Sequence, residues 1–409
     1  MWTSQAARIC RRRGHKTYIF GNHGGLLGAR RANDEGVEHI YTSTGWNRVV
    51  NRLWKTYSAA SKFAGRDRPA LPGFASKWLD LGYAMEVGRR LRELECDIVQ
   101  VMNYSQFLPE IRKLNPKCRI SLHMQCEWLT QLDRAVIEER ISHADLIVGC
   151  SEYITRKNAD HFPQFENRCV TVPNAAHVTD GEDRLEADPN LVLFVGRVSP
   201  EKGVHDLVKA FHRVLERFPD ARLRIAGGVG SAPYEFIVGL SNEPHVTALR
   251  VFYEREGDGK RDPYGVWLER EAGEEMGKRI FFEGRIPHSD VAKYYERAAV
   301  LVNPSLSESF GITLVEAMMH RVPVVATRVG GMTYTVDHGI TGLLVDPADT
   351  SALASAICDV LEDRGKARRM GDAGRKKAID KFSWEATMDL LLDHFDRIVR
   401  GNGGKEPCD

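Results

Sequence analysis

Two glutamates flank a Phe-Gly pair in the stretch 304–316, which reads PSLSESFGITLVE. An apolar run precedes this stretch and a helical pattern follows it, so we expect a strand, a loop and the start of a helix. If the interval were helical throughout, Glu308 and Glu316 would lie roughly 12 Å apart at ~1.5 Å per residue. Two carboxylates at that separation could each bind hydroxyls along one extended, polyhydroxylated ligand. Three backbone N–H groups would be free to meet an anionic part of it, those of Ser309, Phe310 and Gly311.

Two cations follow another apolar run, 191–195. Arg197 and Lys202 would lie just past the end of a strand, and Lys202-Gly203 would open a helix over about 204–218. A guanidinium and an ammonium group there could clamp a pyrophosphate and offset the charge that develops on a departing phosphate. The alternative is an ordinary solvated loop, which composition alone favours.

Two further positions could face a ligand. Gly330-Gly331 follows the apolar run 322–327 and would let the backbone approach a ligand closely, although a plain turn would also place glycines there. His123 ends the run 119–123. A single histidine at a strand end is more often a structural residue than a functional one.

These segments together resemble the retaining glycosyltransferases of family 4. The family signature is Glu, Phe-Gly, a second Glu and Ala-Met, followed by Pro-Val-Val-Ala-Thr and Gly-Gly. The chain reads ESFGITLVEAM at 308–318, PVVAT at 323–327 and Gly-Gly at 330–331, with LFVGRVSPEKG at 193–203. Each piece alone is weak evidence, but their order and spacing are specific, and the resemblance is dense from about 191 to 384.

The resemblance implies a role for each of these residues. Arg197 and Lys202 would bind the pyrophosphate of a nucleotide-sugar, and Glu316 would bind its ribose. Glu308 would contact the transferred sugar, and His123 would face that sugar from the other domain. The remaining donor contacts would come from Ser309, Phe310, Gly311, Gly330 and Gly331.

The implied reaction is transfer of a hexose from a nucleotide-sugar to a glycan or lipid-linked acceptor, in cell-surface polysaccharide or glycolipid synthesis. Front-side attack would retain the anomeric configuration. We expect no cofactor and no metal, since Arg197, Lys202 and the helix start supply positive charge and the sequence has no Asp-x-Asp motif. Three alternatives stay open: a nucleotide-sugar epimerase of the same fold, a non-catalytic remnant, and a dinucleotide oxidoreductase, which rests weakly on the incomplete glycine motif at 228–230.

Composition limits the classes of protein that need considering. A chain of 409 residues is too long for one ordinary core, so we expect two domains. The 43% apolar and 28% charged residues are typical of a soluble globular protein. A net charge of +1 provides no overall field that would recruit nucleic acid. The eight scattered cysteines, and the lack of a signal-peptide pattern, favour a reduced cytoplasmic setting.

Short apolar runs alternate with amphipathic patterns along the chain, which indicates parallel sheets with crossover helices and an α/β fold. The runs are 17–20, 98–102, 119–123, 146–149, 170–172, 191–195, 222–226, 280–283, 300–302 and 322–327. The resemblance implies the GT-B architecture, in which two doubly wound, Rossmann-like domains face each other across a cleft. The expected parts are an acceptor-side domain at 1–178, a linker at 179–190, a nucleotide-sugar-binding domain at 191–381, a helix returning to the first domain at 382–400, and a disordered tail at 401–409.

Three departures from the family pattern lead to further expectations. The chain opens inside the helix that usually follows the first strand and its Gly-rich loop, so that strand is expected to be missing. Its loss would leave two unpaired strand edges and little activity. The segment 229–278 is longer than a usual link between strands and is expected to be a surface insertion with a helix near 265–276. Arg321 replaces the usual glycine at a helix end, where a left-handed backbone costs ~1 kcal/mol.

The stretch 46–68 combines basic residues with an apolar, aromatic face. Two interpretations are open. Such a helix can lie on anionic lipid, which would place the protein at the inner face of the membrane. It can equally pack on the sheet of its own acceptor domain.

Overall fold

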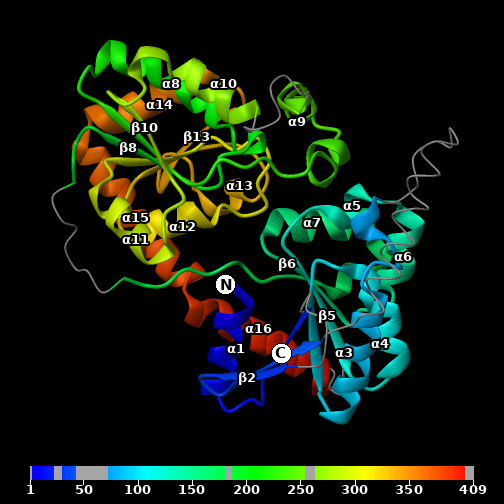
Figure 1. Ribbon diagram of the computed structural model, residues 1–409. Helices are drawn as coiled ribbons and strands as arrows, with labels where there is room; N and C mark the ends of the chain where they lie inside the picture. Colours follow the sequence, from blue (N-terminus) through cyan, green and yellow to red (C-terminus); the bar gives the residue numbers. More distant parts are fainter. Residues whose placement is uncertain (1, 23–29, 43–71, 180–186, 254–262, 401–409) are drawn as a thin grey trace, which may run out of the picture. The chain divides into compact units, whose positions relative to one another are not determined.

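A computed structural model describes residues 2–22, 30–42, 72–179, 187–253 and 263–400 (Figure 1). The chain divides into two compact units: unit 1 comprises residues 1–172 and 387–409, and unit 2 comprises 173–386. The expected domain boundaries at 178 and 382 lie near these limits. The stretch 46–68, the tail 401–409 and most of the expected linker fall outside the described residues.

Unit 2 is built on a six-stranded parallel sheet of order β10-β9-β8-β11-β12-β13. The strands are β8 (Leu191–Val195), β9 (Arg222–Ala226), β10 (Ile280–Gly284), β11 (Val300–Asn303), β12 (Val324–Thr327) and β13 (Gly342–Val345). Strands β8, β11 and β12 are almost entirely buried, as expected for a parallel sheet that is covered on both faces.

Helices cover both faces of this sheet, which makes unit 2 a doubly wound domain (Figure 1). One face carries α8 (Val204–Arg217), α10 (Pro263–Ala272) and α14 (Thr350–Glu362). The other carries α11 (His288–Arg297), α12 (Ile312–Met319), α13 (Met332–Thr335) and α15 (Arg364–Phe382). Phe211, Leu223, Val302 and Ile357 belong to one core cluster between α8, α14 and the sheet.

Short helical elements lie between β8 and α8 and between β9 and β10. They are η4 (Pro200–Lys202), η5 (Tyr234–Phe236), η6 (Val238–Leu240), α9 (Pro244–Thr247) and η7 (Ala248–Phe252), with η8 (Gly273–Glu275) after α10. The expected helix near 265–276 is therefore confirmed as α10 and η8.

Unit 1 contains two sheets among its described residues. A parallel sheet of order β4-β5-β6-β7 is formed by β4 (Ile98–Met102), β5 (Arg119–Met124), β6 (Leu146–Gly149) and β7 (Cys169–Thr171). A smaller sheet of order β1-β3-β2 is formed by β1 (Tyr18–Asn22), β2 (Arg30–Asp34) and β3 (Val37–Thr42). Within the part of the chain that the structure describes, β1 pairs only with β3 and β4 only with β5.

The helices of unit 1 include one from each end of the described chain. In order, its elements are α1 (Trp2–Arg12), η1 (Gly73–Ala75), α3 (Leu81–Glu93), η2 (Ser105–Phe107), α4 (Leu108–Leu114), α5 (Trp128–Gln131), α6 (Arg134–Ile141), α7 (Glu152–His161) and η3 (Pro163–Arg168). From Thr387 onward, α16 (Trp384–Arg400) also belongs to unit 1, so the expected returning helix is confirmed. No helix among the described residues is long and apolar enough to cross a membrane.

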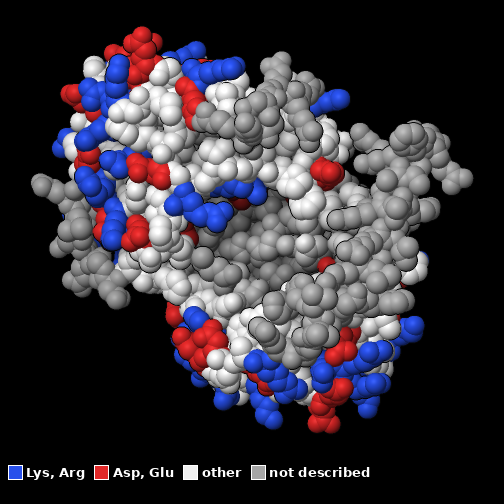
Figure 2. Space-filling model, in the orientation of Figure 1, with Lys and Arg blue, Asp and Glu red and all other residues white. Residues whose placement is uncertain are grey.

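The charged side chains of both signs are interspersed on the described surface that Figure 2 shows. This distribution agrees with the net charge of +1. That face carries no broad single-sign field, so recognition there must depend on local groups.

Candidate active site

The predicted cation and carboxylate of the two loops form an ion pair in unit 2. Lys202 Nζ lies 2.7 Å from Glu308 Oε2, and the side chains are 23% and 17% exposed. Lys202 follows β8 and Glu308 follows β11, and these neighbouring parallel strands place both residues beyond the carboxyl edge of the sheet. Ligands of doubly wound domains bind at this edge.

Glu308 is held as a carboxylate by its surroundings. Burial by itself raises its pKa, but the nearby Lys202 ammonium and the N–H groups of Phe310 and Gly311 outweigh burial, so the net pKa lies below its ordinary value. Phe310 N–H donates to Glu308 Oε1 over 3.4 Å. The expectation of a free N–H group is therefore wrong for Phe310, because the loop carboxylate itself accepts from it.

Arg197 is anchored by a buried glutamate that the sequence does not single out. Its Nη2 lies 2.6 Å from Oε1 of Glu201, which is 1% exposed. Ser199 Oγ donates to the same oxygen over 2.6 Å. The Arg197 side chain remains 48% exposed, so it can still meet a ligand while one side of its guanidinium is fixed.

Glu316 is positioned by a tyrosine from a different helix. Tyr295 Oη, on α11, donates to Glu316 Oε2 over 2.7 Å, and the ring of His320 stacks on Tyr295 at 5.5 Å. Burial raises the pKa of Glu316, although the Tyr295 hydrogen bond and the charge of His288 oppose that shift.

The glycines allow backbone segments to pack at distances that a side chain would prevent. Gly311 adopts φ 87° directly before α12. A Cβ on Gly331 would lie 2.0 Å from the Ser309 carbonyl oxygen, and Gly331 N–H donates to the Glu308 carbonyl over 2.9 Å. Gly330-Gly331 therefore supports the Glu308 loop directly, whereas its predicted approach to a ligand stays a prediction.

The remaining predicted loop residues are accounted for by packing. Phe310 is 2% exposed and contacts the Phe382 ring at 5.5 Å, so it contributes its backbone and not its side chain to the site. Ser309 contributes the carbonyl that abuts Gly331. Arg321 adopts φ 56°, which confirms the expected left-handed end of α12.

His123 belongs to unit 1, whereas the other predicted site residues all belong to unit 2. Its side chain is fully buried, with Gln100 Nε2 at 3.2 Å from Nδ1 and Gln125 Nε2 at 3.0 Å from Nε2. The edge of the Trp2 ring packs on it at 4.7 Å. Burial lowers its pKa to about 3, so the ring is neutral. These contacts favour the structural interpretation, and its sugar-facing role stays a prediction.

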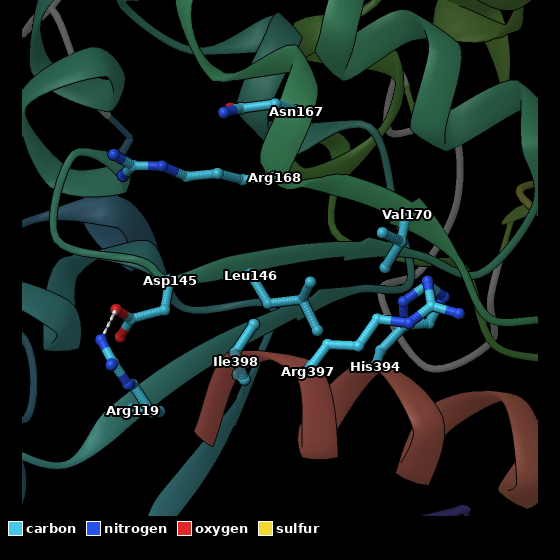
Figure 3. Close-up of a pocket in the computed structure, with 9 residues that line it drawn as sticks. All are labelled: Arg119, Asp145, Leu146, Asn167, Arg168, Val170, His394, Arg397 and Ile398. Carbon is cyan, nitrogen blue, oxygen red and sulfur yellow. Dashed lines mark hydrogen bonds and ion pairs between the residues drawn. The ribbon is translucent and has the colours of Figure 1, made fainter. Parts of the chain in front are cut away.

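A pocket of about 370 Å³ in unit 1 lies at the opposite, amino ends of β5–β7 (Figure 3). Its cations already have partners. Arg119 lies 3.2 Å from Asp145, Arg397 lies 2.5 Å from Asp393, and Arg168 donates to backbone carbonyls. We therefore do not place the donor site there. No cluster of His, Cys, Asp and Glu suited to a metal ion occurs among the residues that the structure describes.

Residues 180–377 match the family model of the glycosyl transferases group 1. The chain is also 31% identical over 282 residues to a D-inositol 3-phosphate glycosyltransferase of Corynebacterium glutamicum, covering 65% of this chain and 60% of that protein. A protein of the same name from Thermobifida fusca is 30% identical over 283 residues, covering 64% and 59%. The chain thus spans about 60% of the length of these two relatives.

Solved structures resemble the whole described fold. A sucrose-phosphate synthase from Thermosynechococcus elongatus superposes with a TM-score of 0.67 at 21% identity, covering 97% of this chain and 92% of that one. Anabaena HepE, solved in complex with UDP-glucose, gives 0.61 at 18% identity, covering 93% and 100%. At such identities the likeness concerns the fold alone. The domain over residues 180–377 thus matches the glycosyl transferases group 1 family, and the fold of the chain is the GT-B fold.

Proposed function

We propose that this protein is a retaining glycosyltransferase that moves a hexose from a nucleotide-sugar to an acceptor hydroxyl. The observation that carries the proposal is the Lys202–Glu308 pair at 2.7 Å, beside an anchored Arg197, at the carboxyl edge of the matched domain. The names of the relatives and the UDP-glucose complex of HepE support the same class of reaction.

The chemistry assigned to this site is front-side displacement. The acceptor oxygen forms a bond to the anomeric carbon on the face from which the nucleoside diphosphate leaves. The bond between that carbon and the phosphate oxygen breaks, and the departing phosphate oxygen takes the acceptor proton. Lys202 and Arg197 would offset the charge that develops on the leaving group. Since two fixed cations supply this charge, we propose that no metal and no cofactor take part.

Two acceptor classes follow from different observations. The first is a glycan or lipid-linked acceptor in cell-surface polysaccharide or glycolipid synthesis, as the resemblance to family 4 implies. The second is a phosphorylated polyol, which the name of the two D-inositol 3-phosphate glycosyltransferases favours. For a lipid-linked acceptor, we propose that the protein is cytoplasmic and contacts the inner face of the membrane through residues 46–68.

A donor panel tests the proposal. Purified protein is incubated with UDP- and GDP-sugars, with and without each acceptor class, and release of nucleoside diphosphate is measured. Transfer requires an acceptor and yields a new glycoside of retained configuration by NMR, whereas an epimerase would convert the donor sugar alone. Addition of EDTA should leave the rate unchanged.

Lys202→Ala is the matched variant for this test. Loss of one preorganised cation should lower turnover about 100- to 1,000-fold, or about 3–4 kcal/mol of transition-state stabilisation. Lys293→Ala, whose side chain is 74% exposed on α11, serves as the control. Near-normal turnover of Lys202→Ala in an active preparation would show that Lys202 does not bind the pyrophosphate.

A further inference from the structure

The long link between β9 and β10 packs against the two loops that carry Lys202 and Glu308. We call residues 234–253 and 263–276 of this link the bracket. The sequence predicts a surface insertion here. The structure instead has η7 of the bracket contacting η4, which carries Lys202, and α10 packed alongside α8. The bracket meets each of the two loops through one polar contact to the backbone.

The first contact is made to the loop of Glu308. His245 Nε2, on α9, lies 3.0 Å from the carbonyl oxygen of Leu306, and its N–H donates to it. Leu306 itself is 2% exposed and belongs to a small apolar cluster with Val238, Val246 and Leu249. The residue held in this way lies only two positions before Glu308.

The second contact is made to the loop of Lys202. Helix α8 has Gly203 at its N-cap, with φ 65° and no side-chain cap. The backbone N–H of His205 donates to Tyr264 Oη over 3.1 Å, and the same oxygen lies 2.9 Å from His205 Nδ1. Tyr264 is fully buried. A tyrosine from α10 thus satisfies an N–H group in the first turn of α8, three residues after Lys202.

The two loops are also locked to each other. Leu306 N–H donates to the Glu201 carbonyl over 2.8 Å, and a Cβ on Gly203 would lie 2.0 Å from the Pro304 carbonyl oxygen. A shift of either loop must therefore move its neighbour. Because a displacement of about 1 Å can cost ~100-fold in rate, whatever fixes these loops also controls the chemistry.

We propose that the bracket positions the Lys202–Glu308 pair for catalysis, and that His245 and Tyr264 are its positioning residues. Neither touches Lys202 or Glu308 directly. Each acts through the backbone of a neighbouring residue, Leu306 or His205. This inference rests on the proposed function for its effect on turnover, but its effect on the loops is independent of any activity.

The test compares His245→Ala, His245→Gln and Tyr264→Phe in the full chain, with Val251→Ala as the control because Val251 is 62% exposed in the same segment. His245→Ala should lower kcat about tenfold, the effect of one lost hydrogen bond, with little change in the KM for donor. His245→Gln should restore most of the loss, since its amide N–H can donate to the same carbonyl. A general loss of stability would not be rescued in this way.

Hydrogen–deuterium exchange reads the loops without reference to turnover. His245→Ala should speed exchange at the amides of 305–311, and Tyr264→Phe should speed it at 204–207. If His245→Ala and Tyr264→Phe both exchange at the rate of Val251→Ala, the bracket does not hold the loops and the inference is wrong. Faster exchange with unchanged kcat would overturn its positioning role. If the parent protein turns over no donor, the proposed function fails, while the exchange data still decide whether the bracket holds the loops.

Discussion

The ammonium group of Lys202 is bound by Glu308, so an incoming pyrophosphate must share it. Glu308→Gln removes the competing charge with little change in shape. It should tighten binding of UDP or GDP about fivefold, as expected for ~1 kcal/mol from a partly exposed pair. Turnover should fall about 100-fold, because the proposed contact between Glu308 and the sugar needs a carboxylate. Calorimetry and rate measurements check both effects. Unchanged affinity would place the pyrophosphate away from Lys202.

Tyr295 fixes one oxygen of the half-buried Glu316, and the proposed contact with a ribose hydroxyl would use the other. Tyr295→Phe removes the donor, so burial of Glu316 is opposed by fewer groups and its pKa should rise further. Leaving this carboxylate without its donor costs about 1–3 kcal/mol. The KM for donor should rise roughly 5- to 100-fold with kcat nearly unchanged, as expected for contacts made equally in ground and transition states.

Tyr294→Phe is the control for that measurement. Tyr294 is the preceding residue of α11, and its hydroxyl donates to Glu283 over 3.3 Å instead of to Glu316. It should leave the KM for donor unchanged. A fall in kcat without a rise in KM in Tyr295→Phe would show that Glu316 does not bind the ribose.

At the scale of the element, helix α8 carries a buried acid that makes its stability depend on pH. Burial raises the pKa of Asp206 from 3.8 to about 6. The folded state therefore binds more protons than the unfolded state, and this contribution to stability is lost as pH rises from about 4 to about 6. The loss amounts to about 3 kcal/mol at 1.36 kcal/mol per pKa unit.

Asp206→Asn should remove this dependence. Relative to the parent, the variant should gain stability progressively between pH 4 and pH 6, which denaturant unfolding at several pH values would measure. His205 contributes in the opposite sense in both proteins, because burial lowers its pKa to about 3 and stability falls as pH drops below about 6.5. Parallel stability curves for the parent and Asp206→Asn would contradict a buried, destabilising Asp206.

All ten apolar runs in the sequence are strands in the structure, because buried parallel strands need continuous apolar sequence. The strands that the pattern misses lack that signal. Strand β2 reads RRAND, is wholly polar except for its alanine and pairs antiparallel with β3 across a turn with Glu35 at φ 51°. Strand β13 begins at Gly342, where a Cβ would lie 2.5 Å from Val324 atoms, so packing and not propensity places it.

The candidate site was predictable in its charged residues but not in their supports. Arg197, Lys202 and Glu308 belong to motifs whose residue types and spacing can be read from the sequence. Glu201 lies only four residues from Arg197, but nothing in the sequence marks it as the buried partner of that guanidinium. Tyr295 contacts Glu316 only because the fold brings α11 and α12 together. No periodicity or composition marks a tyrosine on α11 as the partner of a glutamate on α12. Such long-range hydrogen bonds become visible only once the fold is known.

At the scale of the whole molecule, the described strands of unit 2 form one sheet, whereas those of unit 1 form two smaller sheets. Unit 2 has six strands in one continuous parallel sheet and a buried core that runs from Val192 to Met370. In the described part of unit 1, β1 and β4 each pair on one side. Small sheets leave a larger share of their strands at an edge, where hydrogen bonds and apolar burial are lost, so we expect unit 1 to open at lower denaturant concentration than unit 2.

Unit 2 should therefore fold alone and bind the donor nucleotide. A fragment of residues 173–386 contains the continuous sheet, the bracket and every predicted site residue except His123. We expect cooperative unfolding and calorimetric binding of UDP or GDP without added metal. Lys202→Ala in the fragment should weaken that binding about 10- to 100-fold, the worth of a hydrogen bond to a charged group, while the exposed Lys293→Ala should not. If the full chain binds a nucleoside diphosphate and the folded fragment does not, the nucleotide site needs residues outside unit 2.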